Sequence, residues 1–560
     1  LRVTMRVEDL VRGGNLETHE VEGIGDSSLF SMVEKLTHLV KVDLGLSARA
    51  DTRLDRHLRD VTTSSVEAYR LYAEGMQLRF QTFRFEDAIL FLEKAVAIDS
   101  GFALALAQLG IWHGNLSRPK EMEAYLAEAV QHLDRVTTRE RYYIEACYYS
   151  TREITIAKEI EAYRRLLELY PEDIARHNLA NCYAYLERFP EAIEELEEVR
   201  RRGLVVHNYE LAHAYASLGQ IDRGLQALED ALSFHANRWE IHRNIGLLHT
   251  WAGRYEEAVQ AFDRADVLSP GEEHIAYGRW EIAALRGEWE DAGAYAGEMT
   301  LSAEPYWTWR GFRSQAWNHL YRGRSADALD SLERAALAYG DDGPFSGFAR
   351  SLKSHVLVET AQLEKAIEEA RRAQELGEGH VPEWQGLFFE GLAQARLGRF
   401  EDARKTAQKL RRRTEPIPGN REKRRWHHLS GEIALAAGEH EQAIGELEKA
   451  RSLLPPRGLH WPRGRLNDHV PVWYSLASAY VAAGDEEEAL HFFSRIAESG
   501  YEHLYWPIPY VRSLSFLASI HENRGELEKA RKLRERFANY WGGFTDMTSL
   551  PLPERSTATQ

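Results

Sequence analysis

The chain of 560 residues is poor in cysteine and proline and has no long apolar run. Its two cysteines, Cys147 and Cys182, exclude a disulfide scaffold and any zinc module built from several cysteines. No stretch approaches the roughly 18 consecutive apolar residues of a membrane-spanning helix. Basic residues are in the minority, because 70 Lys and Arg against 87 Asp and Glu give a net charge of −17. An acidic chain lacks the basic surface of general nucleic-acid binders, so we expect no nucleic-acid partner.

Enzyme motifs are missing as well. The sequence has no phosphate-binding G-x-x-x-x-G-K-[ST] loop, no H-E-x-x-H zinc motif and no G-x-S-x-G in a suitable context. Twenty-three histidines raise the alternative of a metal site, and we favour packing or surface roles for them. The closest groupings are His427 with His428, His235 with His242, and His460 with His469. We therefore predict a non-enzymatic protein with no catalytic residue, no metal and no cofactor.

What the chain does contain is helix-forming residues arranged in a repeating pattern. Seventeen prolines are few for this length, while Ala, Leu, Glu and Arg are abundant, which favours helices. One copy of the pattern is Gly253, Ala258, Phe262, Ala265 and Pro270. Further copies begin at Gly323, Gly398, Gly438, Gly484 and Gly525. Tyr183 and Tyr215 are 32 residues apart, and Gly224 and Ala258 are 34 apart.

A period of about 34 residues with this pattern resembles the tetratricopeptide repeat, or TPR. The resemblance implies an all-α superhelical solenoid of helix-turn-helix units, each packing on its neighbours. Small residues at Gly246 and Ala258 would lie where the two helices of a unit cross, and Gly253 would end the first helix with a left-handed cap. Counting copies gives about thirteen units in an array over residues 61–542, followed by an extended tail over residues 543–560.

The first sixty residues have a different pattern. They predict a hairpin turning at Gly13-Gly14, then a helix capped by Ser27 or Ser28. A hairpin plus one helix is too small for a domain, so we expect residues 1–60 to be the end of a truncated α/β domain. This layout resembles the FlgO-like or TolB-amino-terminal-like domain that precedes TPR arrays in bacterial receptor proteins. The resemblance implies an upstream serine/threonine kinase, nucleotide cyclase or winged-helix domain, and an extracytoplasmic (periplasmic) location, with a cytoplasmic one as the alternative.

The TPR resemblance also implies a binding surface, because such arrays hold a peptide or protein segment on the concave face lined by first helices. The predicted groove residues are His177, Asn178, Asn181, Tyr209, His213, Arg243, Asn244, Tyr277, Arg310, Arg313 and Trp317, with Glu281 beside them. Amides next to a fixed cation and an aromatic ring suit an extended peptide and its carboxylate. The asparagines resemble those of a carboxylate-clamp groove, but the lysine-rich remainder of that clamp is not evident.

Three functional classes stay open. The first is a protein-interaction scaffold or sensor region, which we favour. The second is a structural subunit of a stable assembly or homo-oligomer, with tryptophans such as Trp307, Trp309 and Trp317 at its interfaces. The third is a regulatory region of an upstream kinase or cyclase. The basic stretch from Arg411 to Arg425 suits an acidic partner or a membrane surface, and we favour a solvated loop between repeats.

Overall fold

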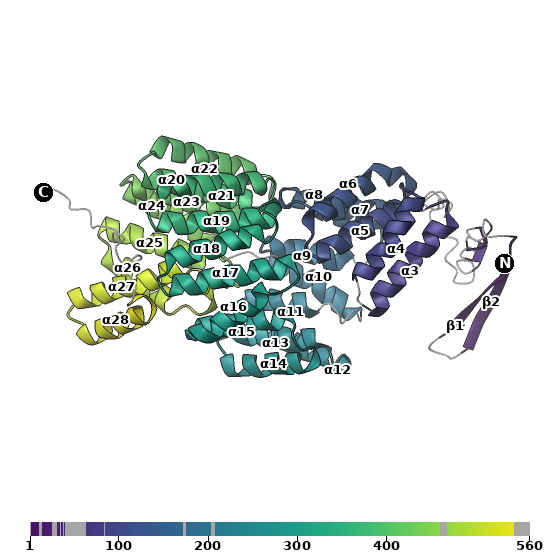
Figure 1. Ribbon diagram of the computed structural model, residues 1–560, viewed down its shortest axis with the longest axis horizontal. Coiled ribbons are helices and arrows are strands. Elements are labelled where there is room, and N and C mark those ends of the chain that lie inside the picture. Colours follow the sequence, from purple (N-terminus) through teal and green to yellow (C-terminus); the bar gives the residue numbers. More distant parts are fainter. Residues whose placement is uncertain are drawn as a thin grey trace. The chain divides into compact units, whose positions relative to one another are not determined.

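The computed structural model describes residues 2–9, 14–24, 28, 31–33, 35, 36, 39, 63–82, 85–171, 175–202, 208–459 and 467–542. Strands β1 (Arg2–Asp9) and β2 (Gly14–Glu22) pair antiparallel and form the predicted hairpin. The Gly13 turn, most of the helix predicted after Ser27 and Ser28, and the tail over residues 543–560 lie outside the described residues. The described elements after the hairpin are helices (Figure 1), as the composition predicts.

The chain divides into two compact units. The first comprises residues 1–151 and 158–175, and the second comprises residues 152–157 and 176–560. The longer helices of the first region are α3 (Val66–Thr82), α4 (Phe85–Ile98), α5 (Ala103–Asn115), α6 (Pro119–Ala129), α7 (Thr138–Tyr149) and α8 (Ile156–Leu169).

The second unit continues the same alternation of helices along the chain. Its first ten are α9 (Ala175–Tyr185), α10 (Phe189–Arg201), α11 (Asn208–Ser217), α12 (Ile221–Phe234), α13 (Trp239–Trp251), α14 (Tyr255–Leu268), α15 (Glu273–Arg286), α16 (Trp289–Thr300), α17 (Pro305–Tyr321) and α18 (Ser325–Leu337). The next ten are α19 (Gly343–Glu359), α20 (Leu363–Leu376), α21 (Val381–Arg396), α22 (Phe400–Thr414), α23 (Asn420–Ala436), α24 (His440–Ser452), α25 (His469–Ala483), α26 (Glu486–Ala497), α27 (Pro507–Asn523) and α28 (Leu527–Trp541).

Small residues allow the two helices of a repeat to approach closely. A Cβ atom at Gly246 would lie 3.0 Å from the Phe262 ring, and Ala258 is fully buried. Gly253 has a φ of +74°, which is the left-handed conformation predicted for the end of α13. These positions confirm the physical reading of the repeat pattern, and the chain folds as an all-α TPR-like solenoid.

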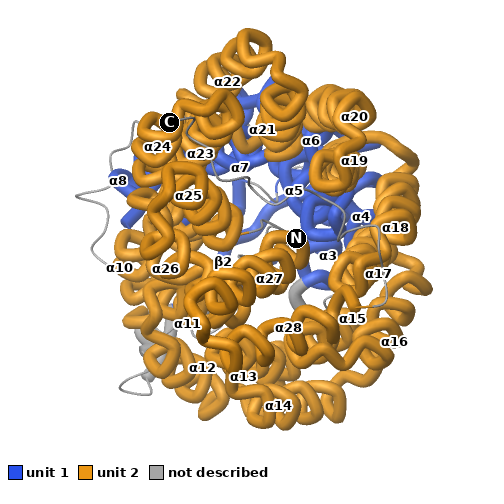
Figure 2. Tube along the Cα trace, turned by 90° about the vertical axis from the view of Figure 1, so that its left-hand side faces the viewer, with its two compact units in different colours: residues 1–151, 158–175 blue, residues 152–157, 176–560 orange. Residues whose placement is uncertain are grey.

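The last helices of the second unit pack against much earlier ones. Trp541 on α28 donates from Nε1 to the Leu320 carbonyl at 2.9 Å, and the Tyr321 hydroxyl donates to the His503 carbonyl at 2.8 Å. Figure 2 shows α27 on the inner side of the curve formed by α11 to α18. Repeats of a solenoid ordinarily contact only their neighbours, so these contacts give the second unit a core between repeats distant in sequence.

The basic stretch from Arg411 to Arg425 is mostly helical, which corrects the expectation of a solvated loop. Its first residues belong to α22 and its last to α23, and only residues 415–419 connect them. Arg413 pairs with Glu383, while Arg421 and Arg424 pair with Glu187 at 2.9 Å. Internal carboxylates therefore neutralise much of this positive charge.

Cys147 and Cys182 are both buried, and neither forms a disulfide bond. Burial raises the pKa of the Cys147 thiol to about 12, so this thiol is un-ionised at neutral pH. Among the described residues, no helix has the length and apolar character needed to cross a membrane.

Candidate functional site

The predicted groove residues lie on alternate helices of the second unit. His177, Asn178 and Asn181 are on α9, Tyr209 and His213 on α11, Arg243 and Asn244 on α13, Tyr277 and Glu281 on α15, and Arg310, Arg313 and Trp317 on α17. The register derived from the repeat thus places them on the first helices of successive repeats. Their environments divide them into a buried part and a partly exposed part.

The buried part is covered by the segment Tyr501–Trp506, which connects α26 to α27. The Tyr501 and Tyr505 hydroxyls both donate to the Glu281 carboxylate, at 2.7 and 2.6 Å. Tyr277 and Tyr505 share a hydrogen bond of 2.5 Å between their hydroxyl oxygens. The Trp317 ring meets the Tyr505 ring edge to face, with centroids 5.9 Å apart. This section of the inner face already holds a peptide segment, and that segment belongs to the same chain.

This buried section contains two arginines that pack on aromatic rings, and one carboxyl group, Glu281. The Arg310 guanidinium lies 3.9 Å from the Tyr277 ring centroid, and Arg313 lies 4.7 Å from that of Trp309. Burial raises the pKa of Glu281 above its ordinary value, although both tyrosine hydroxyls favour its ionised form. Its second oxygen, Oε2, is buried without a hydrogen-bond partner.

His213 and Asn244 form a second buried pair. His213 Nε2 lies 3.0 Å from Asn244 Oδ1, and the Asn244 amide donates to the Glu240 carbonyl at 2.7 Å. The Asn244 oxygen is therefore the acceptor, and His213 carries its proton on Nε2. Burial lowers the pKa of His213 to about 4, so the ring is neutral at pH 7.

The remaining groove residues are partly exposed. They are His177, Asn178, Asn181, Tyr209 and Arg243 on α9, α11 and α13. His177 Nε2 lies 3.5 Å from a Glu210 carboxylate oxygen, which joins α9 to α11. This part of the inner face offers amide, phenol and guanidinium groups to a partner.

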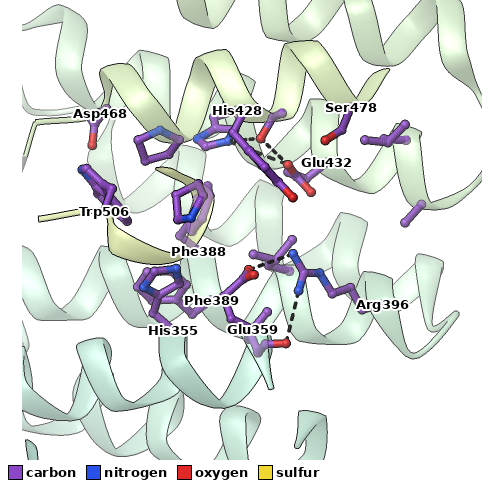
Figure 3. Close-up of a pocket in the computed structure, with 18 of the residues that line it drawn as sticks. His355, Glu359, Phe388, Phe389, Arg396, His428, Glu432, Asp468, Ser478 and Trp506 are labelled. Carbon is purple, nitrogen blue, oxygen red and sulfur yellow. Dashed lines mark hydrogen bonds and ion pairs between the residues drawn. The ribbon is translucent and has the colours of Figure 1, made fainter. Parts of the chain in front are cut away.

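A cavity that the repeat pattern did not reveal lies farther along the same unit. Its volume is about 450 Å³, and its walls come from α19, α21, α23, α25 and α27 together with Trp506 (Figure 3). Sequence reasoning stopped at α17, yet inner-face positions of later first helices also carry His, Glu and Arg. The repeat pattern predicts apolar core residues at these positions. Polar residues there were the sequence signal that could have located the cavity.

One wall of the cavity carries a carboxylate between two arginines. Arg396 Nη2 donates to Glu359 Oε1 at 2.9 Å, and Arg512 pairs with the other oxygen and donates to the Glu359 carbonyl at 2.9 Å. Burial alone would raise the pKa of Glu359, but the two guanidinium groups outweigh it and lower the pKa to about 2. Glu359 is therefore ionised and the three side chains together carry one positive charge.

The opposite wall holds a serine between a histidine and a carboxylate. His428 Nε2 lies 2.8 Å from Ser475 Oγ, and Ser475 Oγ donates to Glu432. Because the single hydroxyl proton goes to the carboxylate, His428 must donate to Ser475 and does not accept its proton. A serine nucleophile requires the reverse, with histidine as the base and the carboxylate on the histidine. This arrangement holds the Ser475 hydroxyl in place but does not activate it as a nucleophile.

Aromatic rings close one end of the cavity. The His355 ring stacks on Phe389 with centroids 5.1 Å apart, and the Trp506 ring meets His355 at 5.4 Å. The Phe388 ring lies 5.0 Å from His428. Burial lowers the pKa of His355 to about 4, so this ring is neutral at pH 7. In the part of the chain that the structure describes, no group of three or more His, Cys, Asp or Glu side chains is arranged to hold a metal ion.

Comparison with known proteins supports the repeat assignment. Residues 209–273 and 390–456 match the model of the tetratricopeptide repeat family. The chain is 27% identical over 198 residues to a Homo sapiens protein named protein O-mannosyl-transferase TMTC1, and the match covers 35% of this chain and 21% of that protein. The chain thus spans about a fifth of the length of this relative.

A solved structure is also similar to part of the chain. It is the crystal structure of a tetratricopeptide repeat protein from Parabacteroides merdae, which is 15% identical with a TM-score of 0.33. The match covers 45% of this chain and 98% of that one. The two segments that match the family model are tetratricopeptide repeats, as the period of the sequence predicts.

Proposed function

We propose that this chain, which carries tetratricopeptide repeats, is a non-enzymatic interaction scaffold or sensor region that binds a peptide or protein segment on the inner face of α9, α11 and α13. The observation that carries the proposal is the partly exposed set of His177, Asn178, Asn181, Tyr209 and Arg243. These residues continue the face that, on α15 and α17, already binds the segment Tyr501–Trp506. TPR repeats are typically protein-interaction modules, and this section is the part of the predicted groove that the chain leaves partly open.

The chemistry of the open section suits a peptide backbone. Each asparagine amide both donates and accepts, so Asn178 and Asn181 match the alternating groups of an extended main chain. Arg243 adds a cation that favours a carboxylate on the partner. We propose contact by Tyr277, Arg310, Arg313 and Trp317 only in a state in which the segment Tyr501–Trp506 has been displaced. We propose contact by His213 and Asn244 only in a state in which their buried hydrogen bond has opened.

A peptide-display experiment tests the open section. A random peptide library is selected on the full chain, and the recovered peptides are measured against the triple variant Asn178→Ala, Asn181→Ala, Arg243→Ala. We expect their affinity to fall at least tenfold while the thermal midpoint stays unchanged. The matched control substitutes three exposed outer-face residues, Gln226, Glu229 and Glu257, by alanine and should bind like the wild type. Undiminished binding to the triple variant would place the partner elsewhere.

The organisation of the whole chain is a further part of the proposal. We propose one array of about thirteen units over residues 61–542, the end of a FlgO/TolB-N-like α/β domain over residues 1–60, and a tail over residues 543–560. By the same resemblance, the array would be an extracytoplasmic region of a bacterial receptor-type kinase, cyclase or winged-helix regulator, with the cytoplasm as the alternative compartment. The sequence of the full gene tests this directly.

One alternative retains support from a particular observation. The aromatic residues of the second unit suit a structural subunit of a stable assembly, and light scattering on native extract would show whether the chain occurs as a lone monomer. The similarity to a protein named a transferase raises transfer chemistry for this chain. Two observations argue against that chemistry: the match covers 21% of that protein, and Ser475 is not hydrogen-bonded as a nucleophile.

A further inference from the structure

We propose that the cavity between α19, α21, α23, α25 and α27 binds a small aromatic zwitterion of dipeptide size, with a free ammonium group at one end and a free carboxylate at the other. This site is distinct from the partner surface on α9, α11 and α13, and it takes a small molecule instead of a protein segment. The proposal rests on four features of the cavity: its volume, one excess charge of each sign on opposite walls, an unsatisfied hydroxyl and an aromatic end.

The volume suits a small ligand. About 450 Å³ lies inside the range of roughly 300–1,000 Å³ that small-molecule pockets occupy. Such pockets are mostly apolar with a few placed polar groups, and this cavity has that composition, with Phe388, Phe389 and Leu392 beside the charged side chains. A single amino acid would leave part of the space empty, so we infer a ligand of about two residues.

The wall around Glu359 has one positive charge in excess. Glu359 contributes one negative charge, while Arg396 and Arg512 contribute two positive charges. Arg396 donates to the Val358 carbonyl at 3.1 Å and to Glu359 at 2.9 Å, which uses two of the five N–H groups of a guanidinium. Its side chain is 34% exposed, so the remaining donors can reach a ligand carboxylate.

The opposite wall has one negative charge in excess. Glu432 accepts a hydrogen bond from Ser475 and lies 3.9 Å from His428, which burial keeps neutral. The nearest arginines on this side are engaged elsewhere, since Arg424 pairs with Glu187 and Asp468, and Arg425 pairs with Glu422.

The same wall carries an unsatisfied hydroxyl. Ser478 Oγ is buried without a hydrogen-bond partner, and the residue is 6% exposed. A buried hydroxyl that makes no hydrogen bond is destabilising, and a ligand ammonium donating to Ser478 and Glu432 would give it a partner.

The two excess charges face the same space from different helices. Figure 3 shows Glu432 and Ser478 on one side of the cavity and Glu359 and Arg396 on the other. Arg396 and Glu432 form no ion pair with each other, although the Glu432 charge helps to raise the pKa of Arg396. A cation and an anion held apart across a partly apolar cavity match a ligand that carries both signs.

The aromatic end determines the side chain of the ligand. The ring centroids lie 5.1 Å apart for His355 and Phe389, 5.4 Å for His355 and Trp506, and 5.3 Å for Phe388 and Phe389. An aromatic ring inserted there gains stacking and edge-to-face contacts in addition to burial. We therefore expect phenylalanyl and tyrosyl ligands to bind more tightly than aliphatic ones.

Titration calorimetry on the full chain tests the proposal with a defined set of probes. Phe-Phe is compared with single phenylalanine, Ala-Ala, N-acetyl-Phe-Phe and Phe-Phe-amide. We expect Phe-Phe to bind, with at least tenfold weaker binding when either end is blocked or when both rings are removed. Tighter binding of phenylalanine than of Phe-Phe would overturn the dipeptide size, because it would show that the two charged walls select a smaller zwitterion.

Substitutions then assign each end of the ligand. In Arg396→Gln, we expect Phe-Phe and Phe-Phe-amide to bind equally, because the carboxylate partner is lost. In Glu432→Gln, we expect the N-acetyl compound to bind as well as Phe-Phe. Glu359 keeps Arg512 when Arg396 is replaced, so the fold should persist, and circular dichroism with a thermal midpoint checks this.

A variant that fills the cavity distinguishes loss of binding from loss of folding. Ala436 lies exposed in the cavity lining at the end of α23, and Ala436→Trp should abolish Phe-Phe binding without a change in the thermal midpoint. Gly445→Trp on α24, where no atom lies within 4 Å of the added Cβ, is the matched control and should bind normally. The proposal is overturned if none of the probes binds at millimolar concentration, or if binding persists unchanged in Ala436→Trp.

Discussion

At the scale of single residues, Glu281 shows how a buried charge can be tolerated inside a repeat protein. Its Oε1 accepts from Tyr501 and Tyr505, and its Oε2 is buried with no partner. Burial raises its pKa, so the folded state holds the proton more tightly than the unfolded chain. The stability linked to this group is full below its ordinary pKa of 4.5 and is lost as the pH rises through the higher folded value.

We therefore predict opposite outcomes for two substitutions of Glu281 at pH 7. Glu281→Gln keeps an acceptor for both tyrosines and cannot ionise, so its free energy of unfolding should equal or exceed that of the wild type. Glu281→Leu leaves the tyrosine hydroxyls without this acceptor and should cost about 1–3 kcal/mol. Urea unfolding followed by tryptophan fluorescence measures both, with exposed Glu257→Gln as the control. A stable Glu281→Leu variant would show that the hydroxyls find other acceptors.

At the same scale, the repeat register predicts which helices carry the proposed groove residues but not the environment of their side chains. The repeat register places Tyr277, Arg313 and Trp317 on first helices, because the register depends on local spacing alone. That these side chains face Tyr505 depends on a contact spanning 228 residues, which no local pattern encodes. For the same reason the cavity escaped prediction, since its walls come from helices of five different repeats.

At the scale of elements, the crossing of two helices depends on the absence of a side chain. A Cβ atom at Gly386 on α21 would clash with the Ala370 carbonyl oxygen on α20, which is backbone and cannot rotate away. Few residue types fit where two helices cross so closely. For this reason the pattern of Gly, Ala and apolar residues in the sequence was enough to predict helix pairs. The lengths of the connections were harder to predict. A solvated loop from Arg411 to Arg425 was a wrong prediction, because helix ends carry the same charged residues as loops.

The two glycines Gly386 and Gly445 allow a clean test of this crossing. Gly386→Ala should destabilise the chain by about 1–3 kcal/mol, because the gain in helix propensity is smaller than the cost of overpacking. Gly445→Ala, in α24 with no atom within 4 Å of the added Cβ, should be neutral or stabilising by up to about 1 kcal/mol. Paired urea titrations give both values. Equal effects at the two sites would mean that the helices separate without cost.

At the scale of the whole molecule, the second unit departs from a simple stack of neighbours. Arg424 on α23 is 1% exposed and pairs with Glu187 at 2.9 Å and with Asp468 at 2.8 Å, which lie 237 and 44 residues away. Burial alone would raise the pKa values of both carboxyl groups, but Arg424 together with neighbouring arginines outweighs it and lowers each to about 2. These two carboxylates stabilise the fold above their ordinary pKa values of 4.5 and 3.8, and that stability is lost as the pH falls toward 2.

Replacing Arg424 by methionine tests whether this cluster holds distant repeats together. The change removes the arginine that is hydrogen-bonded to both buried carboxylates, Glu187 and Asp468, so we expect a loss of about 3–5 kcal/mol at pH 7. The loss should shrink between pH 5 and pH 3, because the carboxyl groups of the variant take up protons there while those of the wild type stay ionised. Urea unfolding at pH 7, 5, 4 and 3 measures this trend. Exposed Arg531→Met on α28 is the control and should leave the free energy of unfolding nearly unchanged at every pH, because solvent screens its pairs with Glu528 and Glu535. A pH-independent loss in Arg424→Met would mean that the arginine acts through packing, and that the contact between distant repeats does not depend on its charge.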